Sequence, residues 1–275
     1  MTIAHDSHET SADVTPAVEP QIIREARVYL VGRQNMDGEA VQRFLDDFGL
    51  SWETDTEVGG EQMVEAGGRI CYMSFGKGRK TNREYIGNLI SMKHGSVLEH
   101  ATWDFIIAGV SRSFSHELVR HRAGWGYSQL SQRYVDESMA NFVEPDVIAG
   151  DERLHAIWLR SVHASHQAYV ELVDGLMQKM THVENKTERR KRVREAARSV
   201  LPNATETLIF VSANARALRH FIELRGSEGA DVEIRKVALE FLRILQREAP
   251  TLFGDYEIVR LEDGTEVAQT QWQKV

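Results

Sequence analysis

The sequence predicts an α+β fold in which one β-sheet packs against long helices within a single domain. Three observations lead to this prediction. Apolar segments of strand length occur in both halves of the chain, stretches with helical spacing dominate the second half, and neither an internal repeat nor a linker divides the 275 residues. A chain of this length buries a core large enough to be stable without covalent cross-links. We therefore expect residues 21–275 to form one domain.

The first twenty residues, MTIAHDSHETSADVTPAVEP, are rich in Ser, Thr, Asp and Pro. They lack the basic start and the apolar run of a signal peptide, and they carry too little apolar surface to join a core. We expect a disordered N-terminal tail over residues 1–20. No later run approaches the roughly 18 apolar residues of a membrane span. A cytoplasmic protein with no membrane partner is the natural prediction, and the single cysteine, Cys71, excludes an internal disulfide framework.

Strands and helices alternate in the first half of the chain. Apolar residues recur between residues 21 and 31 with the alternation of a strand, which Gly, Asn and Asp then end. A polar, acidic stretch leads from there to a helix that begins near Glu61. Thr81 has the side chain of an N-cap and predicts the start of the next helix. Beyond it we expect a strand over residues 101–110, a helix over about 113–120 and an irregular, glycine-bearing segment over 123–126.

Helical spacing dominates the second half of the chain, and a hairpin closes it. Pro202 ends the helical pattern of the preceding residues. Asp263-Gly264 is typical of the tight turn between two antiparallel strands. In order, we expect helices over 153–180 and 189–200, a strand over 208–212, helices over 215–225 and 232–248, and hairpin strands over 256–261 and 266–270.

The charge balance narrows the choice of partners. The chain has 33 basic and 41 acidic side chains, so its net charge is −8 with histidine neutral. This charge argues against a nucleic-acid partner held along a broad basic face, although it permits one focused basic pocket. The basic run from Arg189 to Arg194 is either a solvated helix face or a nucleic-acid contact, and a nucleic-acid-binding protein is therefore an alternative function.

Three familiar kinds of site are absent from the sequence. The glycines at Gly76 and Gly78 do not extend into a dinucleotide or phosphate-loop motif. His116 and His121 are five residues apart and would diverge by roughly 140° on a helix, so they do not suit zinc, and we expect no metal. Cys71 has no nearby histidine to activate its thiol, which argues against a catalytic cysteine.

The segment from Arg120 to Tyr134 has the side chains of a nucleotide site. Arg120 and Arg122 would point to nearly opposite sides of a continued helix, so a shared ligand requires the helix to end there. Gly124 and Gly126 allow that ending. Hydroxyl, amide and guanidinium groups follow, a mixture that binds phosphate and recognises the amide-like edge of a base; a solvated basic turn is the alternative. These groups belong to Ser128, Gln129, Ser131 and Arg133.

Two further clusters combine polar side chains at short spacing. Asn214 stands where a strand gives way to a helix, and Arg216, Arg219 and His220 follow at spacings of three and four. Such residues share one helix face and either bind a dianionic ligand or face water. The second cluster places His94, Glu99 and His100 just before a predicted strand, where a structural role is the alternative.

At these residues the sequence resembles the flavin-dependent thymidylate synthases, the ThyX family, from about Gly67 to the C-terminal hairpin. The family signature is Arg-His-Arg, seven residues, then Ser-x-Arg. This chain has Arg120-His121-Arg122, eight residues, then Ser131-Gln132-Arg133. Supporting segments are Ser96 to His100, Gly109 to Arg112, Ala197 to Pro202, Asn214-x-Arg216 and Ala230 to Arg235.

The resemblance implies a homotetramer that binds FAD between chains and shares each active site across an interface. It also implies that reduced FAD gives hydride, NADPH recharges the flavin, and 5,10-methylenetetrahydrofolate supplies the one-carbon unit. Carried onto this sequence, the nucleotide contacts are Glu117, Arg120, Gln129, Leu130, Ser131, Arg133, Arg198 and Arg225. The flavin contacts are Ser96, Glu99, His121, Arg122, Asn214, Arg216 and His220.

The resemblance also implies roles in the reaction. Arg225 and Arg133 would stabilise negative charge on the uracil or fix the phosphate. Ser131 would contact the base without attacking it, and His94 matches a position tied to flavin or folate handling. A flavin can carry the hydride and redox steps, which leaves the protein to orient the ligands.

Two departures from the family pattern bear on the substrate. The loop after Arg122 has one extra residue and reads Ala-Gly-Trp-Gly, and Gly229 stands where the family commonly has histidine. Both would reshape a pocket without removing its charged anchors. We therefore expect C5-methylation of both UMP and dUMP, as in similar proteins of polyoxin-type nucleoside-antibiotic pathways; a dUMP-specific thymidylate synthase is the alternative.

Overall fold

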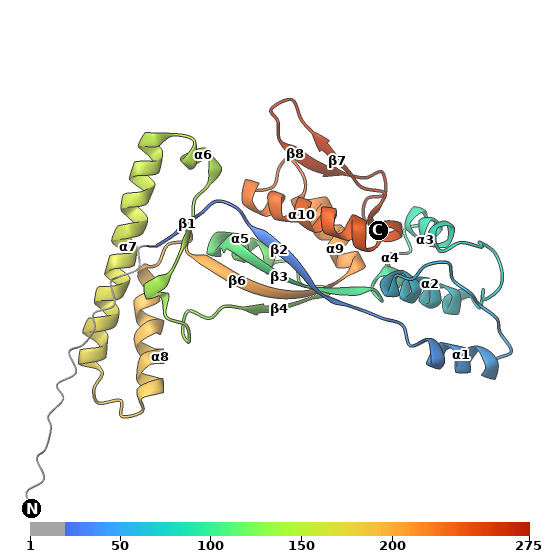
Figure 1. Cartoon of the computed structure of the whole chain (residues 1–275), viewed down its shortest axis with the longest axis horizontal. Coiled ribbons are helices and arrows are strands. Elements are labelled where there is room, and N and C mark those ends of the chain that lie inside the picture. Colours follow the sequence, from blue (N-terminus) through green and yellow to red (C-terminus); the bar gives the residue numbers. More distant parts are fainter. Residues whose placement is uncertain (1–19) are drawn as a thin grey trace, which may run out of the picture.

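The computed structural model describes residues 20–275, so the tail predicted over residues 1–20 lies, apart from Pro20, outside the described residues. A four-stranded antiparallel sheet with the order β2-β3-β6-β4 forms the centre of an elongated molecule (Figure 1). Its strands are β2 (Arg27–Arg33), β3 (Thr102–Ser111), β4 (Trp125–Gln129) and β6 (Glu206–Asn214). The mixture of helix and sheet confirms the predicted α+β class.

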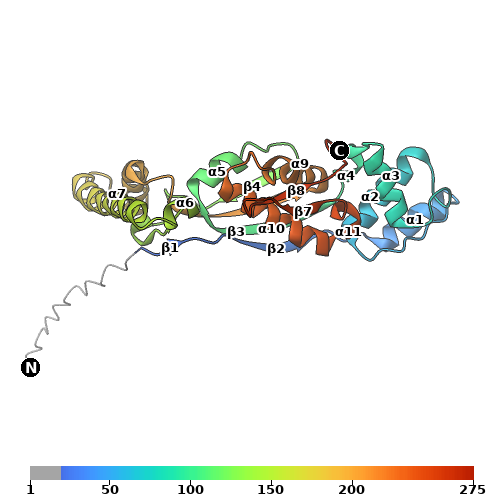
Figure 2. The ribbon, with the colours of Figure 1, turned by 90° about the horizontal axis from the view of Figure 1, so that it is seen from above.

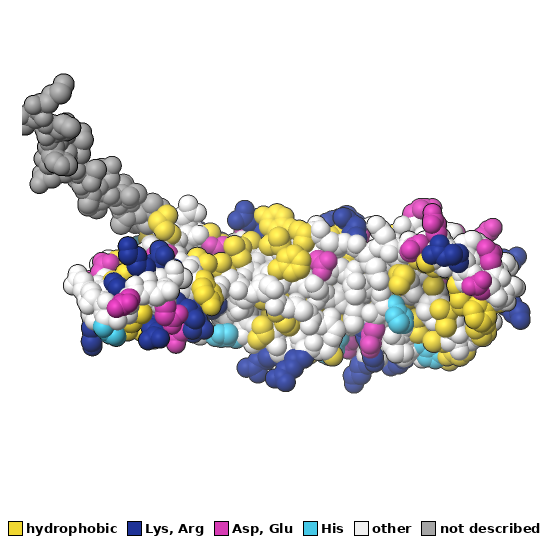
Figure 3. Space-filling view, turned by 90° about the horizontal axis from the view of Figure 1, so that it is seen from below, with side chains coloured by type: hydrophobic (Ala, Val, Ile, Leu, Met, Phe, Trp, Pro, Cys, Tyr) yellow, Lys and Arg dark blue, Asp and Glu magenta, His cyan; other side chains and the backbone are white. Residues whose placement is uncertain are grey.

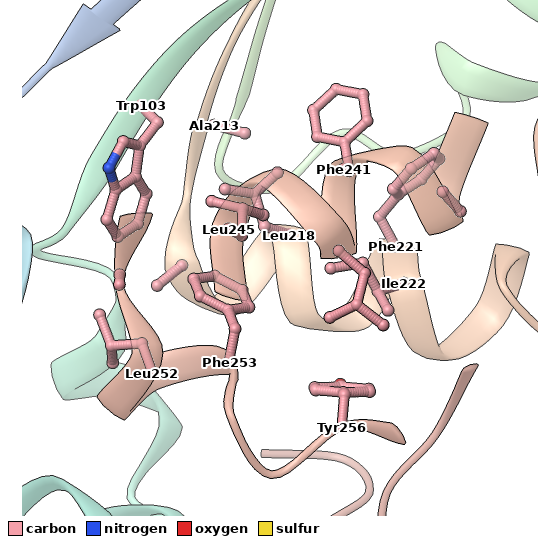
Figure 4. Packing of buried hydrophobic residues seen from close by; sticks show 14 of the residues in the cluster. Trp103, Ala213, Leu218, Phe221, Ile222, Phe241, Leu245, Leu252, Phe253 and Tyr256 are labelled. Atoms are coloured by element: carbon pink, nitrogen blue, oxygen red, sulfur yellow. The ribbon is translucent and has the colours of Figure 1, made fainter. Parts of the chain in front are cut away.

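One face of the sheet is apolar and covered by helices. Cross-strand register aligns Leu30, Phe105, Val211 and Tyr127 in one row across all four strands. The helices α9 (Ala215–Arg225), α10 (Val232–Glu248) and α11 (Pro250–Phe253) lie over this face (Figure 1). Their aromatic and aliphatic side chains fill the space between sheet and helices, as the close view of Trp103, Phe221, Phe241 and Phe253 shows (Figure 4).

Helices also extend the molecule at both ends of the sheet (Figures 1 and 2). One end carries α1 (Gly38–Asp47), α2 (Gly59–Tyr72), α3 (Asn82–Ser91) and α4 (Gly95–Leu98). The other end carries α6 (Asp146–Ala149), α7 (Glu152–Lys179) and α8 (Lys186–Ala197). α5 (Arg112–Leu118) follows β3, β1 (Ile22–Ile23) pairs in parallel with β5 (Phe142–Val143), and β7 (Glu257–Arg260) pairs with β8 (Glu266–Gln269) as the predicted hairpin.

The opposite face of the sheet carries no helix in the described part of the chain (Figure 1). Tyr29, Ile106 and Phe210 lie side by side on it, and Val31 and Leu208 lie on the same strands. All five side chains are exposed. Figure 3, which views the molecule from below, shows hydrophobic side chains gathered near its middle. We call these five residues the open sheet face.

Three sequence-based predictions of secondary structure were wrong. The single strand expected over residues 21–31 is two strands, β1 and β2, which join different sheets. The polar stretch before Glu61 contains α1, capped by Asp37. The segment expected to be irregular over 123–126 leads directly into β4, because the backbone of Trp125 to Gln129 pairs with β6. None of the helices between residues 20 and 275 has the length and apolar content that crossing a membrane requires.

Candidate active site

A polar cluster joins the end of α5 to the end of α9. Ser111 caps α5, accepting a hydrogen bond from the backbone N–H of Phe114. The helix then carries Glu117 in its last turn. Arg225, in the last turn of α9, donates from Nη1 to Glu117 Oε2 at 2.7 Å and from Nε to His121 Nε2 at 3.1 Å. Two segments more than a hundred residues apart thus orient one guanidinium group.

The pKa values of the two partners of Arg225 shift in opposite directions: that of Glu117 is raised and that of His121 is lowered. Burial raises the pKa of Glu117, Asp231 beside it adds to the rise, and the positive charge of Arg225 opposes it. Burial, together with the smaller effects of the neighbouring Arg225 and His220, lowers the pKa of His121 to about 4. Since a guanidinium nitrogen can only donate, Nε2 of His121 must keep its lone pair, which agrees with a neutral imidazole at pH 7.

Acid should therefore destabilise the protein through His121. The pKa of this side chain is about 4 in the folded chain against 6.5 ordinarily, so the unfolded chain binds more protons between these pH values. The stability that the neutral ring contributes is complete above pH 6.5 and is lost as the pH falls towards 4. Between these pH values, the free energy of unfolding in urea should fall less steeply with decreasing pH in His121→Gln than in the parent protein. Parallel curves would contradict the assignment.

A second group of predicted residues lies around the end of β4 and the end of α8. Gln129 donates from Nε2 to Ser115 Oγ at 2.9 Å, and Ser131 Oγ accepts from the backbone N–H of Arg133. The Arg133 guanidinium forms an ion pair with Glu195 Oε2 at 2.7 Å, and its Nε is buried without a hydrogen-bond partner. Polar contacts thus hold these side chains against α5 and α8, and their role as nucleotide donors stays a prediction.

Arg112 also belongs to this second group, although it was not among the site residues predicted from the sequence. Arg112 donates from Nη2 to the carbonyl oxygen of Leu130 at 2.8 Å, and its Nε is buried without a partner. Burial lowers the pKa of Arg112; nearby Glu137 opposes this shift, and the positive charge of Arg198 adds to it. The guanidinium groups of Arg112 and Arg198 lie near each other, and Arg112 has an unused donor. Such a pair suits a phosphate. The only sequence signal was the position of Arg112 in the segment Gly109 to Arg112, one of those that support the family resemblance.

A third group lies between α4 and the start of α9. Arg216 donates from Nη1 to Glu99 Oε1 at 2.6 Å, and both side chains are about half exposed. Asn214 caps α9, since its Oδ1 accepts from the backbone N–H of Ala217 at 2.9 Å. Ser96, Arg122 and His220 are exposed. His94 precedes α4, and its ring stacks on Tyr72 with centroids 6.1 Å apart.

Arg219 does not belong to the third group, contrary to its grouping with Arg216 and His220 from the sequence. Its side chain is 2% exposed, points from α9 towards the core and forms an ion pair with Asp255. Residues 219 and 220 are about 100° apart around a helix, so when His220 faces water, Arg219 turns towards the core.

Gly124 fixes the loop between the first and third groups. Its φ of +74° is left-handed, and a Cβ there would lie 2.5 Å from Asn214 Nδ2. A Cβ on Gly126 would meet only Ser212, at an ordinary 3.7 Å. Gly124→Ala should therefore lower the free energy of unfolding by about 2 kcal/mol through backbone strain and a disturbed cap. Gly126→Ala should change it by less than about 0.5 kcal/mol. Equal losses in urea unfolding would contradict this account.

The predicted site is only partly assembled within one chain. Glu117, His121 and Arg225 come together, and His220 adjoins them with its ring centroid 5.8 Å from that of His121. Within residues 20–275, no hydrogen bond or ion pair joins Arg133 to this first group or to the third. Arg120 is exposed beside the first group and donates to the His116 carbonyl. In the same described range, no group of three or more His, Cys, Asp or Glu side chains is placed to hold a metal ion.

Comparison with known proteins identifies the family to which these residues belong. The family described as thymidylate synthase complementing protein matches residues 54–251. A flavin-dependent thymidylate synthase of Mycobacteroides abscessus is 50% identical over 222 residues, covering 80% of this chain and 88% of the relative. The enzyme of the same name from Mycolicibacterium gilvum is 51% identical with the same coverage. That of Mycobacterium marinum is 48% identical over 232 residues, 83% and 92% of the two chains. The chain is thus an enzyme of the flavin-dependent thymidylate synthase family.

Proposed function

We propose that the protein methylates C5 of dUMP, with 5,10-methylenetetrahydrofolate as the one-carbon donor. The observation that carries this proposal is the guanidinium of Arg225, oriented by Glu117 and by a neutral His121 within a family of thymidylate synthases. A preorganised donor of this kind stabilises negative charge as it develops on a bound uracil. FAD is the cofactor of the family and NADPH is its reductant; the flavin, once bound and reduced by NADPH, would supply the hydride.

The other residues take roles that suit their chemistry. We assign the phosphate to Arg133 and Arg198, with Arg112 beside them, because unused guanidinium donors gather there. Gln129 and the backbone of Leu130 bond to α5 beside Arg112, and we assign them, with Ser131, to contacts with the base, while Glu117 and Arg120 complete the uridylate site. Arg225 and Arg133 stabilise charge during the reaction, and Ser131 orients the base.

The third group fits a flavin nucleotide. Exposed or half-exposed donors, namely the Ser96 hydroxyl and the Arg122 and Arg216 guanidiniums, suit a diphosphate. A Cβ on Gly95 would lie 2.9 Å from Arg216 Nε, so a larger residue at position 95 would displace the arginine. Glu99 pairs with Arg216 and Asn214 caps the same helix, so both would adjoin the flavin, and His121, His220 and His94 are the further flavin contacts that we assign from the family resemblance.

The comparisons favour dUMP over the UMP that the sequence analysis predicted. The relatives are named thymidylate synthases, and thymidylate is a deoxyribonucleotide. Gly229, one of the two departures behind the UMP prediction, is exposed, and a Cβ there would have open space around it. The extra loop residue precedes β4, which keeps regular pairing with β6. Nothing at either position favours a ribonucleotide.

A homotetramer with shared active sites would complete the arrangement. The open sheet face exposes five apolar side chains, a surface that a second copy of this chain would cover. In the part of the chain that the structure describes, no hydrogen bond or ion pair joins Arg133 to the first group, and a second chain could complete the site there. Size-exclusion chromatography with light scattering would give the mass of the assembly, and a monomer at micromolar concentration would contradict this part of the proposal.

Product analysis tests the reaction directly. The protein is supplied with FAD, NADPH and methylenetetrahydrofolate, and with either dUMP or UMP, and the nucleotides are examined by mass spectrometry. We expect dUMP to gain the mass of one methylene group and UMP to remain unchanged. The variant Cys71→Ser, which alters an exposed thiol outside all three groups, should retain the activity. Unchanged dUMP would refute the reaction, and comparable UMP turnover would refute the preference.

A further inference from the structure

We infer that His121 is a positioning residue for Arg225, whose guanidinium it holds through Nε2 in the orientation that meets the uridylate. This inference rests on the proposed function, because it assigns to His121 a role in substrate binding that acts through Arg225. This role of His121 is distinct from the flavin contact that the family resemblance implies for the same imidazole ring.

First, the guanidinium of Arg225 is held in one orientation by two contacts. Arg225 has two orienting contacts on different edges: Nη1 meets Glu117 at 2.7 Å, and Nε meets His121 at 3.1 Å. The carboxylate alone would leave the planar group free to rotate about the axis between the two groups. A second acceptor on the Nε edge removes that rotation. Nη2 then remains for a ligand, since neither of these two contacts uses it.

The second step is the environment of the imidazole ring. His121 is 7% exposed. Its ring lies edge-on to Phe221, with centroids 5.2 Å apart, and near Trp125 at 6.3 Å. The hydroxyl of Tyr127 donates to the backbone carbonyls of His121 and Leu118, which fixes the loop that carries the ring. A side chain held on so many sides cannot swing out to follow a mobile ligand, whereas it can serve as a fixed acceptor.

The third step is the charge of the ring. Arg225 and His220 on α9 both face His121, and the carboxylate of Glu117 binds a different nitrogen of the same guanidinium. A protonated imidazole would place a second positive charge against Arg225 and would lose the lone pair that accepts its hydrogen bond. The neutral form is therefore required, and burial favours it in this position. The central histidine of the Arg-His-Arg motif is thereby distinguished from its two exposed arginine neighbours.

The test is a double-mutant cycle read by nucleotide binding. Calorimetry gives the dissociation constant of dUMP on the FAD-loaded protein and that of FAD on the flavin-free protein. Both constants are measured for His121→Leu, for Arg225→Ala and for the double variant. His121→Gln offers an amide oxygen near the position of Nε2 and serves as the rescue. His166→Gln is the matched control, because that histidine bonds the Ser138 carbonyl from α7, outside all three groups.

We expect His121→Leu to weaken dUMP binding about 10-fold or more, the cost of losing a hydrogen bond to a charged group, and His121→Gln to recover most of it. In the Arg225→Ala background the same leucine substitution should change dUMP affinity less than about 2-fold, because the partner is already gone. An equal loss in both backgrounds, or a loss confined to FAD affinity, would overturn the inference. Failure of the parent protein itself to bind dUMP would instead refute the proposed function.

One further measurement needs no substitution at position 121. Nitrogen-15 NMR of the parent protein reports which ring nitrogen of each histidine carries a proton. We expect Nε2 of His121 to be unprotonated at pH 7 and the Nε–H signal of Arg225 to be protected from exchange. A protonated Nε2 at pH 7 would overturn the inference even if every variant at this position failed to fold.

Discussion

Replacing Arg225 with alanine is expected to lower kcat/KM for dUMP methylation by about 10²- to 10³-fold, the loss typical of removing one preorganised donor to developing negative charge. The substitution also leaves Glu117 without its ion-pair partner in a site where burial already raises the pKa of the carboxyl. Turnover with dUMP, followed by product mass spectrometry, measures the loss.

Two companion variants separate this role from a general effect of charge. Arg225→Lys keeps the positive charge but lacks the planar fork that reaches Glu117 and His121 together, so it should recover less than a tenth of the parent activity. Arg192→Ala removes an exposed guanidinium that pairs with Glu188 on α8 and should leave activity unchanged. Full activity in Arg225→Lys would show that charge alone is needed at this position.

The largest effect on stability is expected at the ion pair between Arg219 and Asp255. Arg219 donates from Nη1 and Nη2 to the two carboxylate oxygens of Asp255 at 2.6 and 2.8 Å, and its guanidinium lies 4.8 Å from the centroid of the Tyr256 ring. Since Arg219 is 2% exposed, Asp255→Ala leaves a buried charge without its counter-ion. We expect the free energy of unfolding in urea to fall by about 3–5 kcal/mol.

An exposed pair supplies the control for that prediction. Glu188 pairs with Lys191 and Arg192 on the surface of α8, and Glu188→Ala should leave the free energy of unfolding nearly unchanged, because solvent screens exposed ion pairs. Replacing both Arg219 and Asp255 with apolar residues of similar size should cost less than Asp255→Ala alone, because no unpaired charge then remains. A loss below 1 kcal/mol for Asp255→Ala would show that water still reaches Arg219.

Helices with a strong apolar stripe and a clear end were predictable from the sequence. α10 has the predicted bounds, and α3 begins at the predicted cap, where Thr81 Oγ1 accepts from the backbone N–H of Glu84. α1 was missed because its sequence is polar and its only buried side chain is Leu45. β4 was missed because glycine and serine interrupt it, and its strand character comes from pairing with β6 rather than from its own residues.

The residues of the candidate site could be named from the sequence, but their contacts with one another could not. The Arg-His-Arg motif marked Arg120, His121 and Arg122 as a unit, yet the structure buries only the histidine. Which side chain faces the core depends on where α5 ends and on the aromatic residues that close around it. Arg112 was missed for a related reason: an arginine at the start of a helix has no distinguishing pattern until Leu130 and Arg198 are placed beside it.

The central claim is that guanidinium groups from separate segments act on one uridylate beside the flavin. A crystal structure of the protein with FAD and dUMP tests it most directly. We predict that Arg225, still bonded to Glu117 and His121, contacts the nucleotide, and that Arg133 and Arg198, contributed by the same chain or by a neighbouring one, contact its phosphate. A nucleotide bound elsewhere, with these three side chains facing water, would contradict the account.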